Sequence, residues 1–356
     1  MHIEASLLKK VTIITLNWNG KRLLGDLLDK HICSLLETDY ENFEVIFADN
    51  GSTDGSPNYV EAHFKDPKLR ILRMGKNYGY SKGNNLAFKE VDPATEIVVF
   101  INNDTIVDKA WLKELIKGFS DPDVVITQPL IMSMETGRIQ FIGGFVDEYG
   151  RSMTISGEYD ERINNILMGL IKTLKSSALR VLWAYGACIA VKKEFFERIG
   201  GFNELFFPGL EEQTLCIPAH SLGYKTIIVP RSIVWHRSGA TIKHVQKKYK
   251  GHETFGRLLF VLIYTSGLKM LIKGLIGRII LEFLISLKMF NPLAFFEALY
   301  RLCREFRTIL CLRRRTYKLP SNSPYIIKSP LLLNKYLHAA LALTKLFEIN
   351  HPNSAT

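Results

Sequence analysis

Short apolar runs alternate with amphipathic stretches in the first third of the chain. The runs are rich in β-branched residues and apolar on both faces, which predicts strands of a sheet covered on both sides: Val11–Leu16, Val45–Ala48, Leu69–Leu72 and Ile97–Ile101. Between them, helical spacing with polar starts predicts three helices: Lys21–Glu37, Ser56–Phe64 and Ser81–Val91. This alternation indicates an α/β fold with a mostly parallel central sheet flanked by helices.

The pattern loosens after Ser120. Three further strands are predicted, over Val124–Thr127, Ala187–Val191 and Thr226–Val229. Between the first two, residues 151–180 are predicted to be a mobile insertion with a short amphipathic helix. From Lys243 onward the sequence predicts helices rich in Leu, Ile and Phe. We therefore expect three parts, with a break near Gly239–Lys250 before the last: residues 1–118, 119–241 and 242–356.

The charge is distributed unevenly between these parts. Residues 237–356 contain 20 Lys and Arg against 5 Asp and Glu, whereas residues 1–236 contain 26 against 30. A mildly acidic body with a strongly basic tail favours a polyanionic partner, such as an anionic membrane surface, a lipid phosphate or nucleic acid. No recognition motif accompanies the basic residues, so no nucleic-acid partner is expected.

The spacing of the cysteines and the length of the longest apolar stretch indicate the cellular compartment. Five scattered cysteines without a C-x-x-C spacing argue against a disulfide framework and a zinc site, and favour a reduced, cytoplasmic protein. The longest apolar stretch, Leu258–Leu268, is about 11 residues long, short of the ~20 that a spanning helix needs. We therefore expect a peripheral protein on the inner face of the cell membrane, although this length leaves a span open.

Asn and Asp clusters follow three of the predicted strands, at Asn17–Gly20, Asp49–Ser56 and Asn102–Thr105. Because parallel strands end at the same sheet edge, where ligands bind in such folds, these clusters predict one polar site. Asp49 with the following Gly and Ser could accept hydrogen bonds from a base or ribose; a capped tight turn explains the motif about equally well. Asp104 could present a carboxylate to Mg²⁺ or Mn²⁺, where an Asx turn is the structural alternative.

Two later segments carry further candidates. Gly75–Asn85 (GKNYGYSKGNN) is rich in Gly and Asn, which suits close backbone approach to a diphosphate or sugar, although a capped turn explains it too. In Phe206–Tyr224, Glu211 and Glu212 open a predicted helix, whose N-terminus should keep a catalytic carboxylate charged near neutral pH. His236 could complete a metal site, although a lone His is more often structural.

Taken in order, the segments VTIITLNWNG, DNGSTDGS, NYGYSKGNN, INNDT, WAYGACIAVKKEFFERIGGFNE, EEQTLC…LGY and VWH resemble an inverting family-2 glycosyltransferase of the GT-A fold, in its rhamnosyltransferase-like branch. The resemblance covers about Val11–Thr241. It implies a Rossmann-like nucleotide-binding half, an acceptor-binding half, and beyond them the basic α-helical C-terminal region.

The resemblance also implies roles for individual residues. For the donor, it implies base or ribose contacts by Asn17 and Asp49, phosphate and sugar contacts by Asn77, Gly83 and Asn84, and a sugar-pocket wall of Gly186 and Ala187. Asp104 would bind Mn²⁺ or Mg²⁺, with Asn103 in the middle of the family's D-x-D-like element, Asn102 in place of its first Asp, and His236 as a possible second ligand. Glu212 falls at the catalytic base, with Glu211 beside it.

Three residues depart from the family pattern. Thr214 stands where a second acid is usual, Pro218 where an Arg is usual, and Asn203 in place of the Asp of GGFDE. In the family, these positions shape the acceptor side.

The resemblance implies an enzyme that transfers a sugar from a UDP-, dTDP- or GDP-linked donor to a lipid-linked or cell-envelope glycan, such as a polyprenyl-phosphate-linked acceptor, with inversion. The alternative is a catalytically impaired, nucleotide-sugar-binding scaffold at the membrane. A sugar-nucleotide nucleotidyltransferase is disfavoured because LNWNGKRLL lacks its Gly-rich, basic phosphate loop. A homo-oligomer is possible.

Overall fold

The protein is described from a computed structural model, which covers residues 8–173, 178–206, 209–237, 239, 250–320, 322–328, 343–346 and 349–350. The domain break predicted near Gly239–Lys250, and with it most of the basic stretch Lys243–Lys250, lies outside the described residues.

A ten-stranded sheet forms the centre of the protein. Along its main path the order is β10-β12-β6-β11-β4-β1-β2-β3, with β5 paired to β12 and β7 paired to β6. The strands are β1 (Val11–Asn17), β2 (Phe43–Asp49), β3 (Leu69–Arg73), β4 (Ile97–Asn102), β5 (Thr105–Val107), β6 (Val124–Ser133), β7 (Ile139–Phe141), β10 (Leu179–Val181), β11 (Cys188–Lys192) and β12 (Lys225–His236).

The four strands β4, β1, β2 and β3 are parallel, which confirms the predicted parallel half. Beyond β4 the sheet is mixed: β11 runs antiparallel to both β4 and β6, whereas β12 is parallel to β6. The same sheet runs through residues 1–118 and 119–241, so the division into those two parts stays a prediction.

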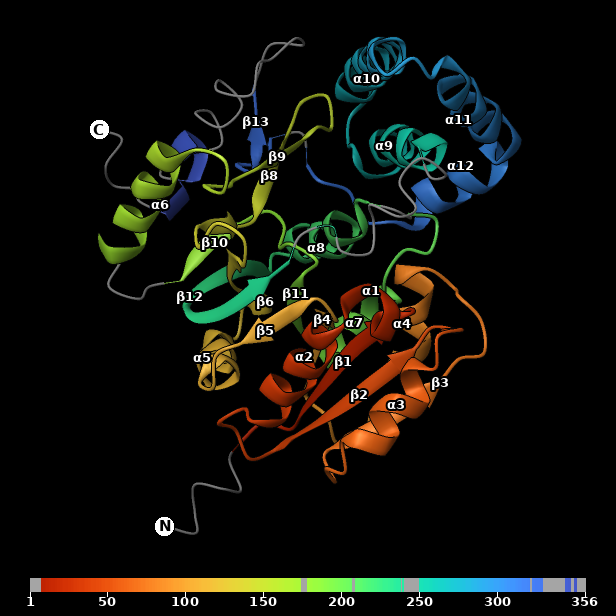
Figure 1. The fold of residues 1–356 in the computed structure, drawn as a ribbon. Helices are drawn as coiled ribbons and strands as arrows, with labels where there is room; N and C mark the ends of the chain where they lie inside the picture. Colours follow the sequence, from red (N-terminus) through yellow and green to blue (C-terminus); the bar gives the residue numbers. More distant parts are fainter. Residues whose placement is uncertain are drawn as a thin grey trace.

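Helices cover both faces of this sheet (Figure 1). One face packs on α2 (Asp26–Leu36), α3 (Ser56–His63) and α5 (Trp111–Lys117), and the other on α4 (Tyr80–Phe88), α7 (Lys193–Ile199) and α8 (Glu211–Ser221). The single helix predicted over Lys21–Glu37 is two helices, because Gly25 between α1 (Gly20–Leu24) and α2 has a φ of 56°, outside the right-handed helical region.

A small sheet and five helices complete the described part of the fold. Within residues 151–180, α6 (Glu161–Thr173) is the predicted amphipathic helix, and it lies near the three-stranded sheet of β8 (Gly144–Asp147), β9 (Ser152–Thr154) and β13 (Ile326–Ile327). The helical tail is confirmed as α9 (Lys250–Tyr264), α10 (Leu268–Lys288), α11 (Pro292–Arg304) and α12 (Phe306–Arg315).

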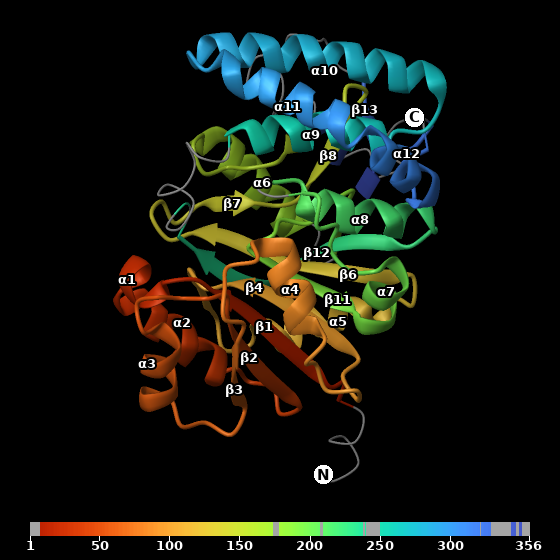
Figure 2. The same cartoon turned by 90° about the vertical axis from the view of Figure 1, so that its right-hand side faces the viewer.

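Figure 2 shows that α9 lies between α8 and α10, and that α10 is the outermost element at the end of the molecule away from β3. The α9 side chains Leu258, Leu259 and Phe260 are buried in the same core as α8. None of the helices within the described residues is long and apolar enough to cross a membrane.

Candidate active site

Hydrogen bonds join the ends of three parallel strands. Asn17, at the end of β1, is fully buried, and its Nδ2 donates to Asp49 Oδ1 at the end of β2 (3.1 Å). Its Oδ1 accepts from Nδ2 of Asn103, just beyond β4 (2.8 Å). The loop after β2 folds back on this network, because Ser52 N donates to Asp49 Oδ2 (3.0 Å). The sequence-predicted residues Asn17, Asp49 and Asn103 are therefore brought together.

The loop before α4 is fastened to the same edge by Asn50. Its Oδ1 accepts from Tyr78 N (2.9 Å), and its Nδ2 donates to Asn77 Oδ1 (3.2 Å). Gly51 has a φ of 75°, and a Cβ on it would lie 2.4 Å from the Lys76 backbone. Only glycine allows both this conformation and this approach, so Asn50 and Gly51 set the position of the exposed Asn77.

Asp104 and His236 lie beside this network. His236 ends β12, which pairs with β5 so that His236 is opposite Thr105, and its Nε2 is 3.2 Å from Asp104 Oδ1. Gln140 Nε2 donates to Glu158 Oε1 (3.3 Å), so its Oε1 faces His236 Nδ1 at 2.5 Å and accepts a hydrogen bond from it. With Nδ1 engaged by Gln140, the ring presents Nε2 to Asp104.

A buried histidine on α2 holds the other side of Asp104. His31 Nδ1 lies 2.9 Å from the carbonyl oxygen of Thr105, and its Nε2 lies 2.9 Å from Thr15 Oγ1. Burial lowers the pKa of His31 to about 4, so the ring is neutral and donates only from Nδ1. His31 is thus a positioning residue that fixes the start of β5, one residue after Asp104.

The Asp104–His236 pair suits a divalent cation. Within the part of the chain that the structure describes, the buried Asp104 Oδ1 has no hydrogen-bond partner of good geometry, and a neutral His236 would face it with a second lone pair. Two acceptors at that distance repel each other unless a cation or proton lies between them. No three His, Cys, Asp or Glu side chains of the described residues form a metal cluster. Two protein ligands are typical where substrate phosphate and water supply the rest.

Glu212 lies across from this pair, in the first turn of α8. Its Oε1 accepts a hydrogen bond from Gly186 N (3.1 Å). A Cβ on Gly186 would lie 2.3 Å from that oxygen, so the glycine is what allows the carboxylate to rest on this backbone. The next residue, Ala187, accepts a hydrogen bond from Asn102 N at the end of β4 (2.9 Å). Gly186 and Ala187 therefore connect Glu212 to the strand-end network.

The expectation that helix position keeps this carboxylate pair charged is wrong for Glu211. Burial raises the pKa of Glu211 to about 8, and the charge of neighbouring Glu212 adds to the rise. Burial also raises the pKa of Glu212, although the backbone N–H groups of Glu212 and Gly186 oppose it. Desolvation therefore outweighs the helix N-terminus. At neutral pH Glu211 is mostly protonated, and Glu212 carries the negative charge of the two side chains.

Tyr185 lies between the two candidate centres. Its ring stacks on Phe141, with centroids 3.7 Å apart, and meets the His236 ring edge-on at 6.3 Å. Burial raises the pKa of Tyr185, and the charges of Glu212 and Asp104 raise it further. Because Tyr185 contacts His236 and precedes Gly186, which binds Glu212, it links the two candidate centres along the chain. Neither Tyr185 nor Gln140 was among the predicted site residues; Tyr185 lies within the segment WAYGACIAVKKEFFERIGGFNE, whereas no motif marks Gln140.

The family model for glycosyl transferase family 2 matches residues 11–199, more than half of the chain. The chain belongs to this family. The match ends before Glu212, so it includes the strand-end network and Asp104 but not the residues of α8 and β12.

Curated relatives agree with this family. The chain is 25% identical to the N-acetylglucosaminyl-diphospho-decaprenol L-rhamnosyltransferase of Mycobacterium tuberculosis, over 60% of this chain and 72% of the relative. It is 27% identical to the O-antigen biosynthesis protein RfbC of Myxococcus xanthus over 65% of this chain. It spans only 18% of RfbC, and 22% of the y4gI protein of Sinorhizobium fredii, to which it is 28% identical over 58% of its length.

Two solved structures share the fold. The mannosyltransferase PcManGT from Pyrobaculum calidifontis, in complex with GDP-Man and Mn²⁺, aligns with 98% of this chain and 89% of its own at a TM-score of 0.51 and 17% identity. GalNAc-T7 with UDP, GalNAc and Mn²⁺ aligns with 71% of this chain and 50% of its own at a TM-score of 0.54 and 15% identity. The fold of this family-2 transferase is therefore GT-A, as predicted.

Two predicted donor-binding residues lie inside the protein. Asn84 on α4 is 1% exposed, and its Nδ2 donates to Tyr80 O in its own helix (3.1 Å). Gly83 packs on β1, since a Cβ there would lie 3.0 Å from both methyl groups of Leu16. Gly83 thus allows the close packing of α4 on β1, Asn84 bonds within α4, and direct contact of either residue with a donor stays a prediction.

Two of the three departures from the family pattern have hydrogen-bond partners in the structure, and the third lies within α8. Asn203 Nδ2 donates to Tyr264 Oη on α9 (3.2 Å), a bond that an Asp could not donate. Thr214 Oγ1 donates to Glu211 O (2.8 Å) within α8. The helix continues through Pro218 and ends three residues later at Ser221. Asn203 and Thr214 thus adapt this part of the transferase to its helical tail and to the turn that carries Glu211.

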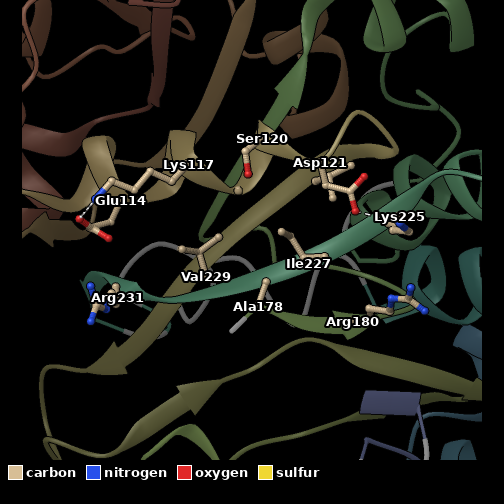
Figure 3. Close-up of a pocket in the computed structure, with 12 residues that line it drawn as sticks. Glu114, Lys117, Ser120, Asp121, Ala178, Arg180, Lys225, Ile227, Val229 and Arg231 are labelled. Atoms are coloured by element: carbon tan, nitrogen blue, oxygen red, sulfur yellow. Dashed lines mark hydrogen bonds and ion pairs between the residues drawn. The ribbon is translucent and has the colours of Figure 1, made fainter. Parts of the chain in front are cut away.

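A separate hollow of about 400 Å³ opens near the start of β12 (Figure 3), lined in part by Lys117, Arg180, Lys225 and Arg231. Lys225 is already paired with Asp121 (2.8 Å) and Asp123 (3.0 Å). None of the predicted site residues lines it. The hollow is therefore distinct from the candidate active site.

Gly186→Ala tests the contact between Glu212 and Gly186. The added Cβ would meet the carboxylate and displace it, so we expect donor turnover to fall about 100-fold or more, because a positioned general base contributes about 10²–10⁴. Gly169→Ala on α6 is the matched control, since its Cβ meets no atom within 4 Å. Turnover is measured as Mn²⁺-dependent hydrolysis of a nucleotide-sugar panel. Equal turnover in both variants would contradict the assigned contact.

Proposed function

We propose that this protein transfers a sugar from a nucleotide-sugar to an acceptor hydroxyl by a single displacement that inverts the anomeric centre. The observation that carries the proposal is that Glu212 and the Asp104–His236 pair are both tied to the polar end of β4, Glu212 through Gly186 and Ala187, and Asp104 through its neighbour Asn103. A single displacement requires a base on one face of the anomeric carbon and a site for the departing diphosphate on the opposite face.

The donor would bind at the strand ends. Asp49 and Asn17 are the proposed contacts for the base or ribose, Asn77 and Asn103 border the diphosphate, and Gly186 walls the sugar. A carboxylate oxygen at a strand end can accept hydrogen bonds from ribose hydroxyls or a base N–H. The two structural relatives are complexes with UDP and with GDP-Man, which supports this class of donor and leaves the choice among UDP, dTDP and GDP open.

Asp104 and His236 are the proposed ligands of Mn²⁺ or Mg²⁺. A divalent cation at these residues would supply Lewis-acid stabilisation of the departing diphosphate. The chain's own contribution is to present one carboxylate oxygen and one imidazole lone pair in a buried place. Gln140 and His31 hold both in orientation, and such outer partners commonly govern metal affinity.

Glu212 is the proposed base. It would take the proton of the acceptor hydroxyl while that oxygen forms the new bond to the anomeric carbon, as the bond from this carbon to the diphosphate breaks on the opposite face. Its raised pKa makes it a stronger base than an exposed carboxylate. Neutral Glu211 places no second negative charge beside the reacting groups.

We propose a lipid-linked or cell-envelope glycan as the acceptor, reached at the inner face of the cell membrane. The support is the name of the Mycobacterium tuberculosis relative, which acts on a diphospho-decaprenol-linked sugar, together with the basic C-terminal region of this chain. The scaffold alternative rests on Thr214, Pro218 and Asn203. It is weakened because Asn203 and Thr214 make structural hydrogen bonds to Tyr264 and to the backbone of Glu211, while Glu212 and Asp104 are present.

Glu212→Gln and Glu211→Gln separate the two carboxyls. The first removes the proton acceptor and should lower kcat about 10²–10⁴-fold, with donor affinity little changed. The second replaces a mostly neutral group by a neutral isostere and should leave kcat within about threefold. If Glu211→Gln gave the large loss instead, the base would be one residue earlier.

The pH profile provides an independent check. Since the base acts when unprotonated, kcat should fall as the pH is lowered through the raised pKa of Glu212, above the ordinary carboxyl value of 4.5.

Asp104→Ala tests the metal site. It removes the carboxylate ligand, so Mn²⁺-dependent donor turnover should be abolished while the melting temperature without ligand stays near wild type. Asp26→Asn, an exposed acid in the first turn of α2, is the control and should behave as wild type. Undiminished Mn²⁺-dependent turnover in Asp104→Ala would remove Asp104 from the metal site.

A further inference from the structure

Exposed apolar side chains are concentrated on one part of the molecule. Sixteen large hydrophobic residues are exposed in the described chain, and fourteen of them lie between Leu268 and Leu310. We name these fourteen the apolar face: Leu268, Ile272, Ile276, Ile280, Phe283, Leu284, Leu287, Met289, Phe290, Leu293, Phe296, Tyr300, Phe306 and Leu310. Monomeric proteins in water rarely expose apolar residues in such numbers on neighbouring elements, and such patches mark interaction sites.

Helix α10 has the reverse of the polarity expected of a helix on a water-soluble protein. Exposed Leu268, Ile272, Ile276, Ile280 and Leu284 recur every fourth residue and form an apolar stripe along the outer side. The stripe runs along most of this 21-residue helix, about 30 Å.

The inner side of α10 is small and charged. Its buried residues are Gly274, Gly277, Arg278, Glu282 and Ser286. Arg278 pairs with Glu282 at 2.9 Å, and Glu282 also meets Arg257 of α9 at 3.3 Å. Leu275 and Ile279 also pack on the core. A helix whose fully buried residues are small or ion-paired, and whose exposed residues are mostly Ile, Leu and Phe, matches an apolar environment outside.

The turn between α10 and α11 projects the most exposed of these side chains. Phe290 is 95% exposed and has a φ of 52°, a left-handed conformation that bulky residues rarely adopt. Leu293 and Phe296 continue outward on α11, while Ala294, Phe295 and Ala298 pack inward. The turn thus presents an aromatic and aliphatic tip.

The charges around the apolar face are nearly all of one sign. Between residues 268 and 315 the exposed basic side chains are Lys269, Lys273, Lys288, Arg304, Arg307, Arg314 and Arg315, and the one exposed acid is Glu297. A second copy of this chain, joined through the same face by a two-fold axis, would bring these seven cations toward seven others. An anionic lipid surface would complement them, at about 1 kcal/mol for each Lys or Arg near the headgroups.

We propose that the apolar face of α10, α11 and α12 is a monotopic membrane-docking surface. The tip at Phe290 and the α10 stripe enter the headgroup–acyl boundary of an anionic bilayer, and the basic side chains contact the headgroups. The inference adds a surface and an orientation to the proposed function. The docking surface itself is argued from the exposed residues alone. Only its purpose, access to a lipid-linked acceptor at the same boundary, rests on the proposed function.

Flotation of the full-length protein with vesicles tests the proposal. We expect it to float with vesicles of phosphatidylglycerol and phosphatidylethanolamine, and more weakly with phosphatidylcholine alone. High salt should weaken the attachment without abolishing it, because burial of apolar area is not screened. The triple variant Phe290→Ser, Leu293→Ser, Phe296→Ser should bind at least about tenfold more weakly, since three apolar side chains no longer insert.

Matched controls separate docking from folding. Tyr159→Ser with Ile166→Ser removes the two exposed apolar residues outside the apolar face and should bind vesicles as wild type does. A second face variant, Leu268→Ser with Ile272→Ser and Ile276→Ser, alters the other end of the stripe and should also bind more weakly. All variants should keep the wild-type melting temperature and donor hydrolysis in detergent-free buffer.

Two results would overturn the inference. One is wild-type flotation of both face variants. The other is failure of the wild type to bind anionic vesicles even at low salt, together with a dimer that the face variants dissociate in light scattering, which would make the face an interface between copies. Flotation without hydrolysis of any nucleotide-sugar would instead support the docking surface and count against the proposed function.

Discussion

The arrangement of the candidate site depends on one buried amide. Asn17 lies at the end of the central strand β1 with no exposure to solvent, so both its side-chain atoms need hydrogen-bond partners inside the protein. It finds them in Asp49 on one side and Asn103 on the other. Three strand ends are thereby held at one edge. Because Asp104 is the residue after Asn103, the same hydrogen bonds fix its backbone at this edge.

The second half of the sheet returns distant residues to this edge. Because β12 pairs with β5, His236 is brought next to Asp104, 132 residues earlier in the chain. Antiparallel β11 starts one residue after Ala187, so Gly186 reaches the same edge and receives the Glu212 carboxylate. Asn203 then links this half to α9, which couples the transferase fold to the helices of the apolar face.

Local sequence signals were sufficient for some of this architecture. The polar clusters after β1, β2 and β4 predicted a shared edge because parallel order alone determines where those strands end. The break at Gly25 was missed because an isolated Gly is tolerated in a helical pattern and its positive φ depends on context. Gln140 lies in no motif and Tyr185 was passed over within one, since their roles arise from contacts with His236 and Phe141 in three dimensions.

Energetic properties were harder to predict than positions. Glu211 was expected to be charged from its place in the first turn of a helix, yet the surrounding core desolvates it, and no pattern in the sequence reports that core. The C-terminal stretches were recognised as basic and apolar. Which side of α10 faces outward depends on Arg257 and the packing of α9, so the inverted polarity becomes visible only in the structure.

The central claim is that the strand ends and the Asp104–His236 pair together bind a nucleotide-sugar with its metal. Thermal-shift titration of the purified protein with UDP-, dTDP- and GDP-sugars, with and without Mn²⁺, tests it most directly. One nucleotide class should raise the melting temperature, and only in the presence of the metal; a ligand at 100 times its dissociation constant stabilises by about 2.7 kcal/mol. The absence of any shift across the panel with Mn²⁺ present, or an equal shift without it, would contradict the account.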